Sequence, residues 1–273
     1  MGPDIFFLGN LVVVAMFMAA LWVVSVVVRD ASIVDPFWGM AFVVIVWSQY
    51  IRAFILVGQP ACETVDCATP WPPAAALLVP ILVTIWGVRL SAYLAWRNLG
   101  KGEDYRYVRM RERAGPRFPL ISFFSVFLLQ ASLAWVVSLP AQAATAGLDV
   151  GAPLVLAGIG LWGAGLFFET VGDLQLARFK RDPANKGKVM DRGLWRYTRH
   201  PNYFGDFCVW WGLYLIAVSA GAWWTAIGPV VMSVLLIRVS GAGLLERTIV
   251  DRRPGYAEYI RRTSGFFPRP PRG

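Results

Sequence analysis

Long apolar runs constrain this chain more than any other feature. They are Ile5 to Val28, Phe37 to Val57, Ala74 to Trp96, Leu120 to Gln142 and Pro153 to Leu176. Each is long enough for a membrane span, because a helix needs about 20 apolar residues to cross a bilayer. A further stretch, Phe204 to Leu236, is too long for one span, and Ser219-Ala220-Gly221 near its middle offers a turn. The sequence therefore predicts an all-α integral membrane protein with seven transmembrane helices.

Charged residues are few and unevenly placed. Hydrophobic residues make up 57% of the 273 residues and charged residues only 16%, against about 45–50% and 25% in ordinary soluble domains. The formal charge of +9 could indicate a nucleic-acid partner, but the basic residues lie between apolar runs instead of covering one soluble face, so we expect no such partner. The first run is too long for a signal-peptide core and no positive segment precedes it, so we expect a retained helix.

Lys and Arg accumulate in alternate connections, and this predicts the orientation, because both residues favour the cytoplasmic side. The third-to-fourth and fifth-to-sixth connections contain Arg97, Lys101, Arg106, Arg109, Arg111, Arg113 and Arg117, and then Arg178, Lys180, Arg181, Lys186, Lys188, Arg192, Arg196 and Arg199. The chain after Arg238 is also basic, whereas connections 58–73 and 143–151 carry only Glu63, Asp66 and Asp149. This alternation requires seven spans, with the N-terminus outside and the C-terminus cytoplasmic, and suits a bacterial inner membrane.

Cysteine and histidine are too few for a metal framework. Cys62 and Cys67 stand in one connection, Cys208 is far away, and His200 is the only histidine. We therefore expect no metal site. On the outer side of a bacterial membrane Cys62 and Cys67 could form a disulfide or remain two thiols, and the sequence leaves both open.

The densest polar stretch runs from Gly193 to Asp206 and reads G-L-W-R-Y-T-R-H-P-N-Y-F-G-D. His200-Pro201 predicts an extended residue and then a helix start, since proline disfavours helical geometry in the residue before it and suits the first helical turn. Asn202 and Asp206 then share one face of that helix. Such a mixture of Arg, Asn and Tyr can bind a polyanion. A surface facing anionic lipid and a carboxylate paired with a nearby arginine are the open alternatives.

Two further motifs accompany this stretch. They are R-N-L-G-K-G-E-D-Y-R-Y (Arg97 to Tyr107) and R-P-G-Y-A-E-Y-I-R-R-T-S-G-F-F-P (Arg253 to Pro268). Together the three motifs resemble the steroid 5-alpha-reductase family, in particular its bacterial members, and the similarity covers nearly the whole chain. The resemblance implies a seven-helix membrane fold and NADPH-dependent reduction of a carbon-carbon double bond conjugated to a ketone. It also implies a lipophilic, steroid-like substrate that enters from the bilayer, and we expect a monomer.

The same resemblance implies a single transmembrane reductase domain, 1–273, whose cofactor site is formed by loops 97–119 and 178–203 and the tail 246–273. The side chains implied to contact NADPH are Asp173, Lys188, Arg192, Tyr197, His200, Asn202, Asp206, Arg238, Glu246, Tyr256 and Tyr259. The basic excess around Lys180, Arg181, Lys188 and Arg192 favours the 2′-phosphate of NADPH over NADH.

Reduction of an enone needs an acid or a hydrogen-bond donor on the ketone oxygen while hydride attacks the β-carbon. In the animal members a Gln-Glu pair and a Tyr on the early helices serve the ketone, and this sequence departs from that pattern. Asp35 is the candidate acid, and Trp86 and Tyr93 lie near the expected place of that tyrosine. Asp35 precedes a proline and could instead cap the second helix.

A glycine motif, two other function classes and a Pro-Arg segment complete the sequence-based expectations. Gly158 to Gly163 matches G-x-G-x-x-G, but it lies in an apolar span with no strand before it, so we expect close helix packing there. A second function class is an S-adenosylmethionine-dependent methyltransferase resembling the isoprenylcysteine carboxyl methyltransferases, which share an R-H-P-x-Y turn. A third is a lipid-binding scaffold, which does not explain Asp206. The Pro-Arg end, Pro268 to Arg272, predicts a loosely ordered tail.

Overall fold

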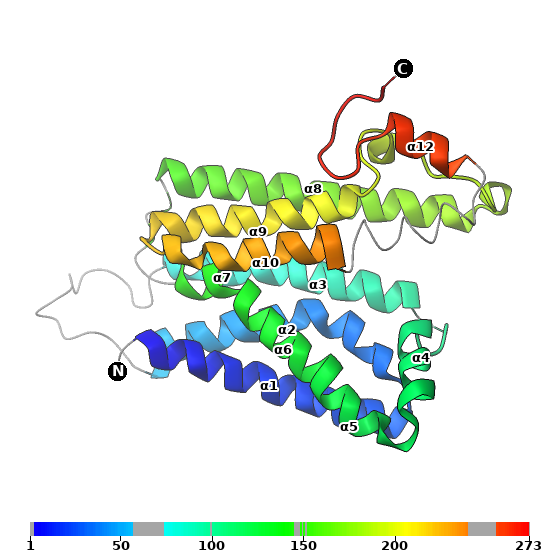
Figure 1. Ribbon diagram of the computed structural model, residues 1–273. Helices are drawn as coiled ribbons and strands as arrows, with labels where there is room; N and C mark the ends of the chain where they lie inside the picture. Colours follow the sequence, from blue (N-terminus) through cyan, green and yellow to red (C-terminus); the bar gives the residue numbers. More distant parts are fainter. Residues whose placement is uncertain are drawn as a thin grey trace, which may run out of the picture. The chain divides into compact units, whose positions relative to one another are not determined.

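The computed structural model describes residues 3–56, 74–98, 100–144, 148, 150, 152–239 and 255–272. These residues form helices and connecting turns (Figure 1). Among them there is no strand, only an isolated bridge between Thr198 and Ser264. The predicted all-α class is confirmed for this part of the chain. The chain divides into two compact units, Met1–Val150 and Gly151–Gly273.

The first unit combines long helices with a helix that is assembled from shorter segments. Its elements are α1 (Pro3–Val28), a 3-10 turn (Ala31–Ile33), α2 (Val34–Tyr50) with a π-helical end (Ile51–Leu56), a 3-10 turn (Ala74–Leu77), α3 (Leu78–Asn98), α4 (Tyr105–Ala114), a 3-10 turn (Gly115–Arg117), α5 (Phe118–Ser122), a π-helical segment (Phe123–Leu128), α6 (Leu129–Val137) and α7 (Leu139–Ala143). Proline stands in the first turn of both α5 and α7. Proline suits that position because its missing N–H has no helical partner there, which explains where the segmented helix restarts.

Helices α2 and α3 run antiparallel and touch through glycine. A Cβ added at Gly39 would lie 2.4 Å from the carbonyl oxygen of Gly87, so the two backbones approach closely. Farther along α2, the Trp47 indole donates to Thr84 Oγ1 at 2.9 Å. This register places the start of α2 beside the last turns of α3.

A buried polar network crosses the interior of the first unit. Asn10 on α1 is fully buried and donates to Gln49 Oε1 at 2.7 Å and to Gln142 Oε1 at 2.8 Å, while Arg52 donates to Asn10 Oδ1. Unpaired polar groups are costly in an apolar span. These contacts therefore fix α1, α2 and α7 in one arrangement.

The second unit is built around two long antiparallel helices. Its elements are α8 (Pro153–Arg181), 3-10 turns (Pro183–Asn185 and Gly193–Arg196), α9 (Pro201–Ser219), a 3-10 turn (Trp223–Ala226), α10 (Ile227–Val234) with a π-helical end (Leu235–Val239), and α12 (Tyr256–Arg262). Gly221 has a φ of 79°, which glycine adopts without strain. The turn that the sequence predicts at Ser219-Ala220-Gly221 is thus confirmed.

Glycines spaced by seven residues form the seam between α8 and α9. A Cβ at Gly158 would lie 2.7 Å from the Gly212 carbonyl oxygen, and one at Gly165 would lie 2.5 Å from the Gly205 carbonyl oxygen. Small residues let helix backbones approach this closely. Gly158 therefore confirms the packing interpretation of the G-x-G-x-x-G match, whereas no atom of the described residues lies within 4 Å of a Cβ at Gly160 or Gly163.

Five helical stretches of the described residues are long and apolar enough to cross a membrane. They are Phe7–Val28, Ala31–Ala53, Ala75–Asn98, Tyr105–Val137 and Pro153–Arg181. They coincide with the five plainest apolar runs of the sequence, and the protein is accordingly a multi-pass membrane protein. The stretch Trp223–Arg238 is apolar but shorter, so the count of seven spans stays a prediction.

The boundaries differ from expectation at α8. The predicted apolar run stops at Leu176, yet α8 continues to Arg181, so Arg178, Lys180 and Arg181 lie on the helix and not in the connection after it. Basic side chains in the last turn are favourable because the carboxyl end of a helix carries partial negative charge. Apolarity marks the membrane segment and not the end of the helix.

Candidate functional site

Polar side chains from α8 and α9 meet where α9 begins. Asn202 Nδ2 donates to Asp173 Oδ1 at 3.2 Å. Asp173 and Glu169, one turn apart on α8, are only 4% and 3% exposed. Asp206 follows Asn202 by one turn on α9, as the sequence predicts. We call Glu169, Asp173, Asn202 and Asp206 the α8–α9 polar cluster.

The side-chain oxygen of Asn202 has no hydrogen-bond donor among the described residues. This atom, Oδ1, is buried. The orientation of the Asn202 amide follows from its contact with Asp173, because the Asp173 carboxylate accepts hydrogen bonds and Nδ2 is the amide atom that can donate one. A buried acceptor without a donor costs about 1–3 kcal/mol, so a ligand that brings a donor would bind favourably here.

Glu169 is a member of the cluster that sequence reasoning missed. It precedes Asp173 by four residues inside an apolar run, a spacing that places both carboxylates on one helix face. Gly205 lies against it, since a Cβ there would be 2.5 Å from the Glu169 backbone nitrogen. An ionisable residue at membrane depth is a functional candidate by default, and this signal could have identified Glu169.

The predicted start of α9 is confirmed, because Pro201 begins the helix. His200 before it is neither helical nor fully extended, with φ −140° and ψ 62°. The His200 ring is buried and stacks on Tyr203, with ring centroids 5.4 Å apart. The structure thus places His200 inside the unit, where it helps to fix the start of α9.

The end of the chain is docked onto this turn. Thr198 Oγ1 donates to the Phe266 carbonyl oxygen at 2.7 Å, and Arg269 N donates to the Tyr197 carbonyl oxygen at 2.9 Å. Arg272 N donates to the Arg262 carbonyl oxygen, also at 2.9 Å. The prediction of a loosely ordered Pro-Arg tail is wrong, because main-chain hydrogen bonds hold it in place.

The tyrosines of α12 belong to the same support. Tyr259 is buried and donates from its hydroxyl to the Trp195 carbonyl oxygen at 2.5 Å. Trp195 in turn donates from its indole to the Gly172 carbonyl oxygen at 3.0 Å. Tyr256 is also buried, with its ring 5.7 Å from that of Tyr259. Tyr259 therefore connects α12 to the turn before α9 and, through Trp195, to α8.

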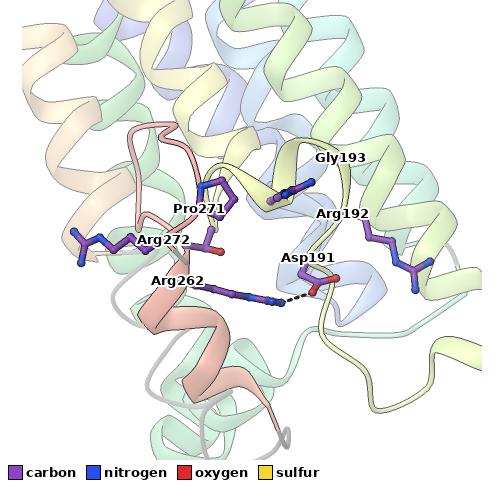
Figure 2. Close-up of a pocket in the computed structure, with 8 residues that line it drawn as sticks. Asp191, Arg192, Gly193, Arg262, Pro271 and Arg272 are labelled. Carbon is purple, nitrogen blue, oxygen red and sulfur yellow. Dashed lines mark hydrogen bonds and ion pairs between the residues drawn. The ribbon is translucent and has the colours of Figure 1, made fainter.

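A basic cavity lies between the connection after α8 and the end of the chain. Its volume is about 590 Å³, and its lining consists of Asp191, Arg192, Gly193, Arg196, Arg262, Thr263, Pro271 and Arg272 (Figure 2). Arg262 donates to Asp191 Oδ2 at 2.5 Å. Of the predicted cofactor residues, Arg192 lines this cavity. Lys188, Tyr197 and Arg238 are exposed elsewhere on the unit, and Glu246, like Cys62 and Cys67, lies outside the described residues.

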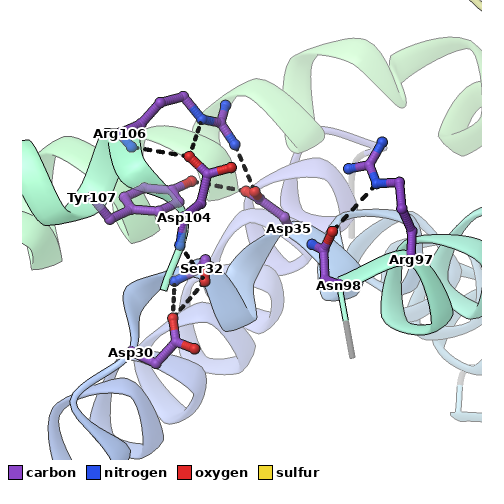
Figure 3. A network of polar contacts seen from close by, with 8 residues as sticks. All are labelled: Asp30, Ser32, Asp35, Arg97, Asn98, Asp104, Arg106 and Tyr107. Carbon is purple, nitrogen blue, oxygen red and sulfur yellow. Dashed lines mark hydrogen bonds and ion pairs between the residues drawn. The ribbon is translucent and has the colours of Figure 1, made fainter. Parts of the chain in front are cut away.

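In the first unit Asp35 is the centre of a polar network at the start of α2 (Figure 3). Tyr107 donates from its hydroxyl to Asp35 Oδ1 and Arg106 donates to Asp35 Oδ2, both at 2.8 Å. Arg106 Nε also donates to Asp104 Oδ1 at 2.9 Å. Asp35 therefore ties α4 to the beginning of α2.

The helix caps in this network differ from expectation. Asp30 accepts from Ser32 N at 2.8 Å and caps the turn before α2, whereas α2 itself starts at Val34 with Ile33 as its cap residue. The capping interpretation of Asp35 is wrong, because Asp35 already lies inside the first turn. Asp104 caps α4; burial by itself would raise the pKa of Asp104, but hydrogen bonds and positive charge from Arg106 lower it overall.

The other two predicted catalytic residues lie on α3. Trp86 is fully buried, with its ring centroid 5.4 Å from that of Phe42. Tyr93 is half-buried, with the Arg89 and Arg97 guanidinium groups 5.7 Å and 5.9 Å from its ring centroid. Trp86 is thus a core residue of the α2–α3 pair, and Tyr93 lies toward the same end of that pair as Asp35.

Apolar spans with buried carboxylates and amides define a helical multi-pass membrane protein whose polar sites lie at helix ends. Residues 21–263 match the family described as proteins of unknown function, DUF1295. The chain belongs to this family. It is also similar to an uncharacterized protein of Schizosaccharomyces pombe, with 25% identity over 308 residues that cover 97% of this chain and 77% of the yeast protein. No solved structure matches the chain.

Proposed function

We propose that the protein is a membrane-embedded, NADPH-dependent reductase of a carbon-carbon double bond conjugated to a ketone, acting on a Δ4-3-ketosteroid or a similar lipid. The observation that carries the proposal is the buried Oδ1 of Asn202, an acceptor without a donor among the described residues. It stands beside the Asp173 carboxylate, in the motif whose resemblance to the steroid 5-alpha-reductase family suggested the function.

The cluster suits the polar parts of a nicotinamide nucleotide. A carboxamide NH₂ group and ribose hydroxyls are donors, and Asn202 Oδ1 and the carboxylates of Glu169, Asp173 and Asp206 are acceptors. NADPH supplies the hydride when bound, and the protein supplies binding and orientation. In this proposal Asn202 and Asp173 hold each other in place, and Asn202 Oδ1 receives a donor of the cofactor.

The residues for the ketone would come from the network around Asp35. Both Asp35 oxygens accept hydrogen bonds, from Tyr107 and from Arg106, an arrangement that suits a carboxylate. In this proposal the Tyr107 hydroxyl, which gives its one proton to Asp35 in the absence of substrate, turns to the bound ketone oxygen and donates that proton there as negative charge develops on it. Tyr93 remains the proposed second donor, and Trp86 supports α3 from the core.

The proposed topology keeps seven spans with the N-terminus outside and the C-terminus in the cytoplasm of a bacterial inner membrane. Helix α9 packs along the whole glycine seam of α8, and Trp223–Arg238 is apolar, so these two stretches would form the sixth and seventh spans. Reporter fusions after residues 144 and 220 should lie outside, and a fusion after residue 272 should lie in the cytoplasm. An external fusion at 272 would overturn the topology.

Ligand-induced stabilisation tests the cofactor. A ligand at 100 times its dissociation constant stabilises the folded state by about 2.7 kcal/mol, so NADPH should raise the melting temperature of the detergent-solubilised protein. Asn202→Ala should abolish most of this rise, while Asn185→Ala, which removes an amide outside the cluster, should keep it. Stabilisation by S-adenosylmethionine and not by NADPH would contradict the reductase proposal and support the methyltransferase.

A further inference from the structure

The basic cavity of the second unit is a separate feature from the α8–α9 polar cluster. Its lining includes four arginines and one aspartate, so its formal charge is strongly positive. Its volume of about 590 Å³ falls within the range of about 300–1,000 Å³ typical of small-molecule sites. An arginine-rich cavity of this size can hold a small molecule that carries an anionic group.

Hydrogen bonds to main-chain carbonyl oxygens fix the two walls of the cavity relative to each other. Arg199 donates through its side chain to the Thr263 carbonyl oxygen at 2.7 Å, and its backbone N–H donates to the Ser264 carbonyl oxygen at 2.9 Å. The Arg272 N–H donates to the Arg262 carbonyl oxygen at 2.9 Å. The backbone positions that carry the arginines are therefore set before any ligand arrives, which lowers the ordering cost of binding.

The internal contact of Arg262 indicates what the cavity recognises. A carboxylate oxygen of Asp191 already accepts from Arg262 (Figure 2). Both side chains are partly exposed, at 43% and 36%, and ion pairs of this kind are worth little. A dianion that also engages the neighbouring arginines can displace Asp191, because guanidinium groups bind phosphate in a bidentate manner.

We propose that this cavity is a binding site for a phosphate group, in which Arg196 and Arg262 bind the oxygens and Asp191 competes for Arg262 when the site is empty. Arg192 and Arg272, whose side chains point away from Arg262 in Figure 2, add positive charge at the rim. The phosphate comes either from a soluble compound or from the headgroup of an anionic lipid. The proposal does not require the reductase function. Its test uses ligands without a nicotinamide, so a failure of NADPH binding and a failure of this site are distinguishable.

Thermal stability of the detergent-solubilised full chain is titrated with inorganic pyrophosphate in one arm and with short-chain phosphatidylglycerol in the other. Phosphatidylcholine is the neutral reference. Binding of pyrophosphate alone assigns a soluble ligand, binding of phosphatidylglycerol alone assigns a lipid headgroup, and binding of both assigns the shared phosphate group; each of these results supports the site. Absence of binding in both arms overturns it.

Variants connect binding to the cavity. Arg196→Gln and Arg262→Gln should each weaken binding about tenfold or more, the size expected for loss of a charge-assisted hydrogen bond. Asp191→Asn should strengthen binding, because it removes the competing carboxylate. Arg261→Gln is the matched control, since Arg261 neighbours Arg262 on α12 but pairs with Glu258. Equal weakening in the control, or weaker binding in Asp191→Asn, would overturn the proposal even if one arginine variant fails to fold.

Discussion

Replacing Gly205 by alanine should force α8 and α9 apart. A Cβ at this position would lie 2.5 Å from the Glu169 backbone nitrogen and 2.5 Å from the Gly165 carbonyl oxygen, whereas ordinary contact begins at 3.4 Å. Both atoms belong to a helix backbone, so neither can rotate away as the end of a side chain can. The helices must therefore separate by roughly 1 Å in a close-packed interior.

Two opposing effects set how much Gly205→Ala changes the free energy of unfolding. Overpacking of this kind costs about 1–3 kcal/mol, and the higher helix propensity of alanine returns up to about 1 kcal/mol. We therefore expect Gly205→Ala to lower the free energy of unfolding by up to about 2 kcal/mol. Gly160 on α8 is the matched control because an added Cβ there would have no atom of the residues that the structure describes within 4 Å, so Gly160→Ala should be neutral or slightly stabilising.

Unfolding of both variants is followed by circular dichroism in mixed micelles of increasing denaturing-detergent content. The reasoning predicts that Gly205→Ala unfolds at lower denaturant than the parent and Gly160→Ala does not. If Gly205→Ala is as stable as Gly160→Ala, the close approach of α8 and α9 is not what the glycine provides.

Other substitutions test the two units separately. Asn10→Leu should lower the free energy of unfolding by about 1–3 kcal/mol in the same assay, because it removes the donor to the buried side-chain oxygens of Gln49 and Gln142; unchanged stability would show that this network is not stabilising. Tyr259→Phe removes the hydroxyl that donates to the Trp195 carbonyl oxygen and should lower the free energy of unfolding by about 1–3 kcal/mol. Unchanged stability would show that this contact of α12 does not stabilise the second unit. Asp35→Asn should lower turnover about 10²–10⁴-fold while the NADPH-induced rise in melting temperature persists, and full activity would remove Asp35 from the mechanism.

Local sequence patterns predicted most of the fold. Apolar runs identify the five plainest spans because a bilayer demands about 20 apolar residues in succession. His200-Pro201 predicts the start of α9, and Gly221 the turn after it, because both depend on backbone geometry of one or two residues. The extension of α8 to Arg181 escaped this reasoning, since hydropathy does not detect a helix that continues beyond the membrane segment.

The sites were less predictable because their contacts join distant parts of the chain. Asp35 meets Tyr107 across 72 residues, and Asp191 meets Arg262 across 71. No periodicity encodes such pairs. Asn202 and Asp206 could be placed on one helix face from their spacing, but the partner of Asn202 lies on another helix. Tyr259 donates from its hydroxyl to the Trp195 carbonyl oxygen, a contact that its sequence position did not reveal, and its predicted contact with NADPH stays a prediction.

The most direct test of the proposed function is turnover by the purified protein reconstituted into lipid nanodiscs. Testosterone or progesterone is supplied with NADPH, and the products are identified by mass spectrometry. The proposal predicts the saturated ketone in an amount equal to the NADPH oxidised, with activity lost in Asn202→Ala and kept in Asn185→Ala. Stabilisation of the protein by NADPH without reduction of any Δ4-3-ketosteroid would contradict the substrate class, and the absence of both would contradict the reductase itself.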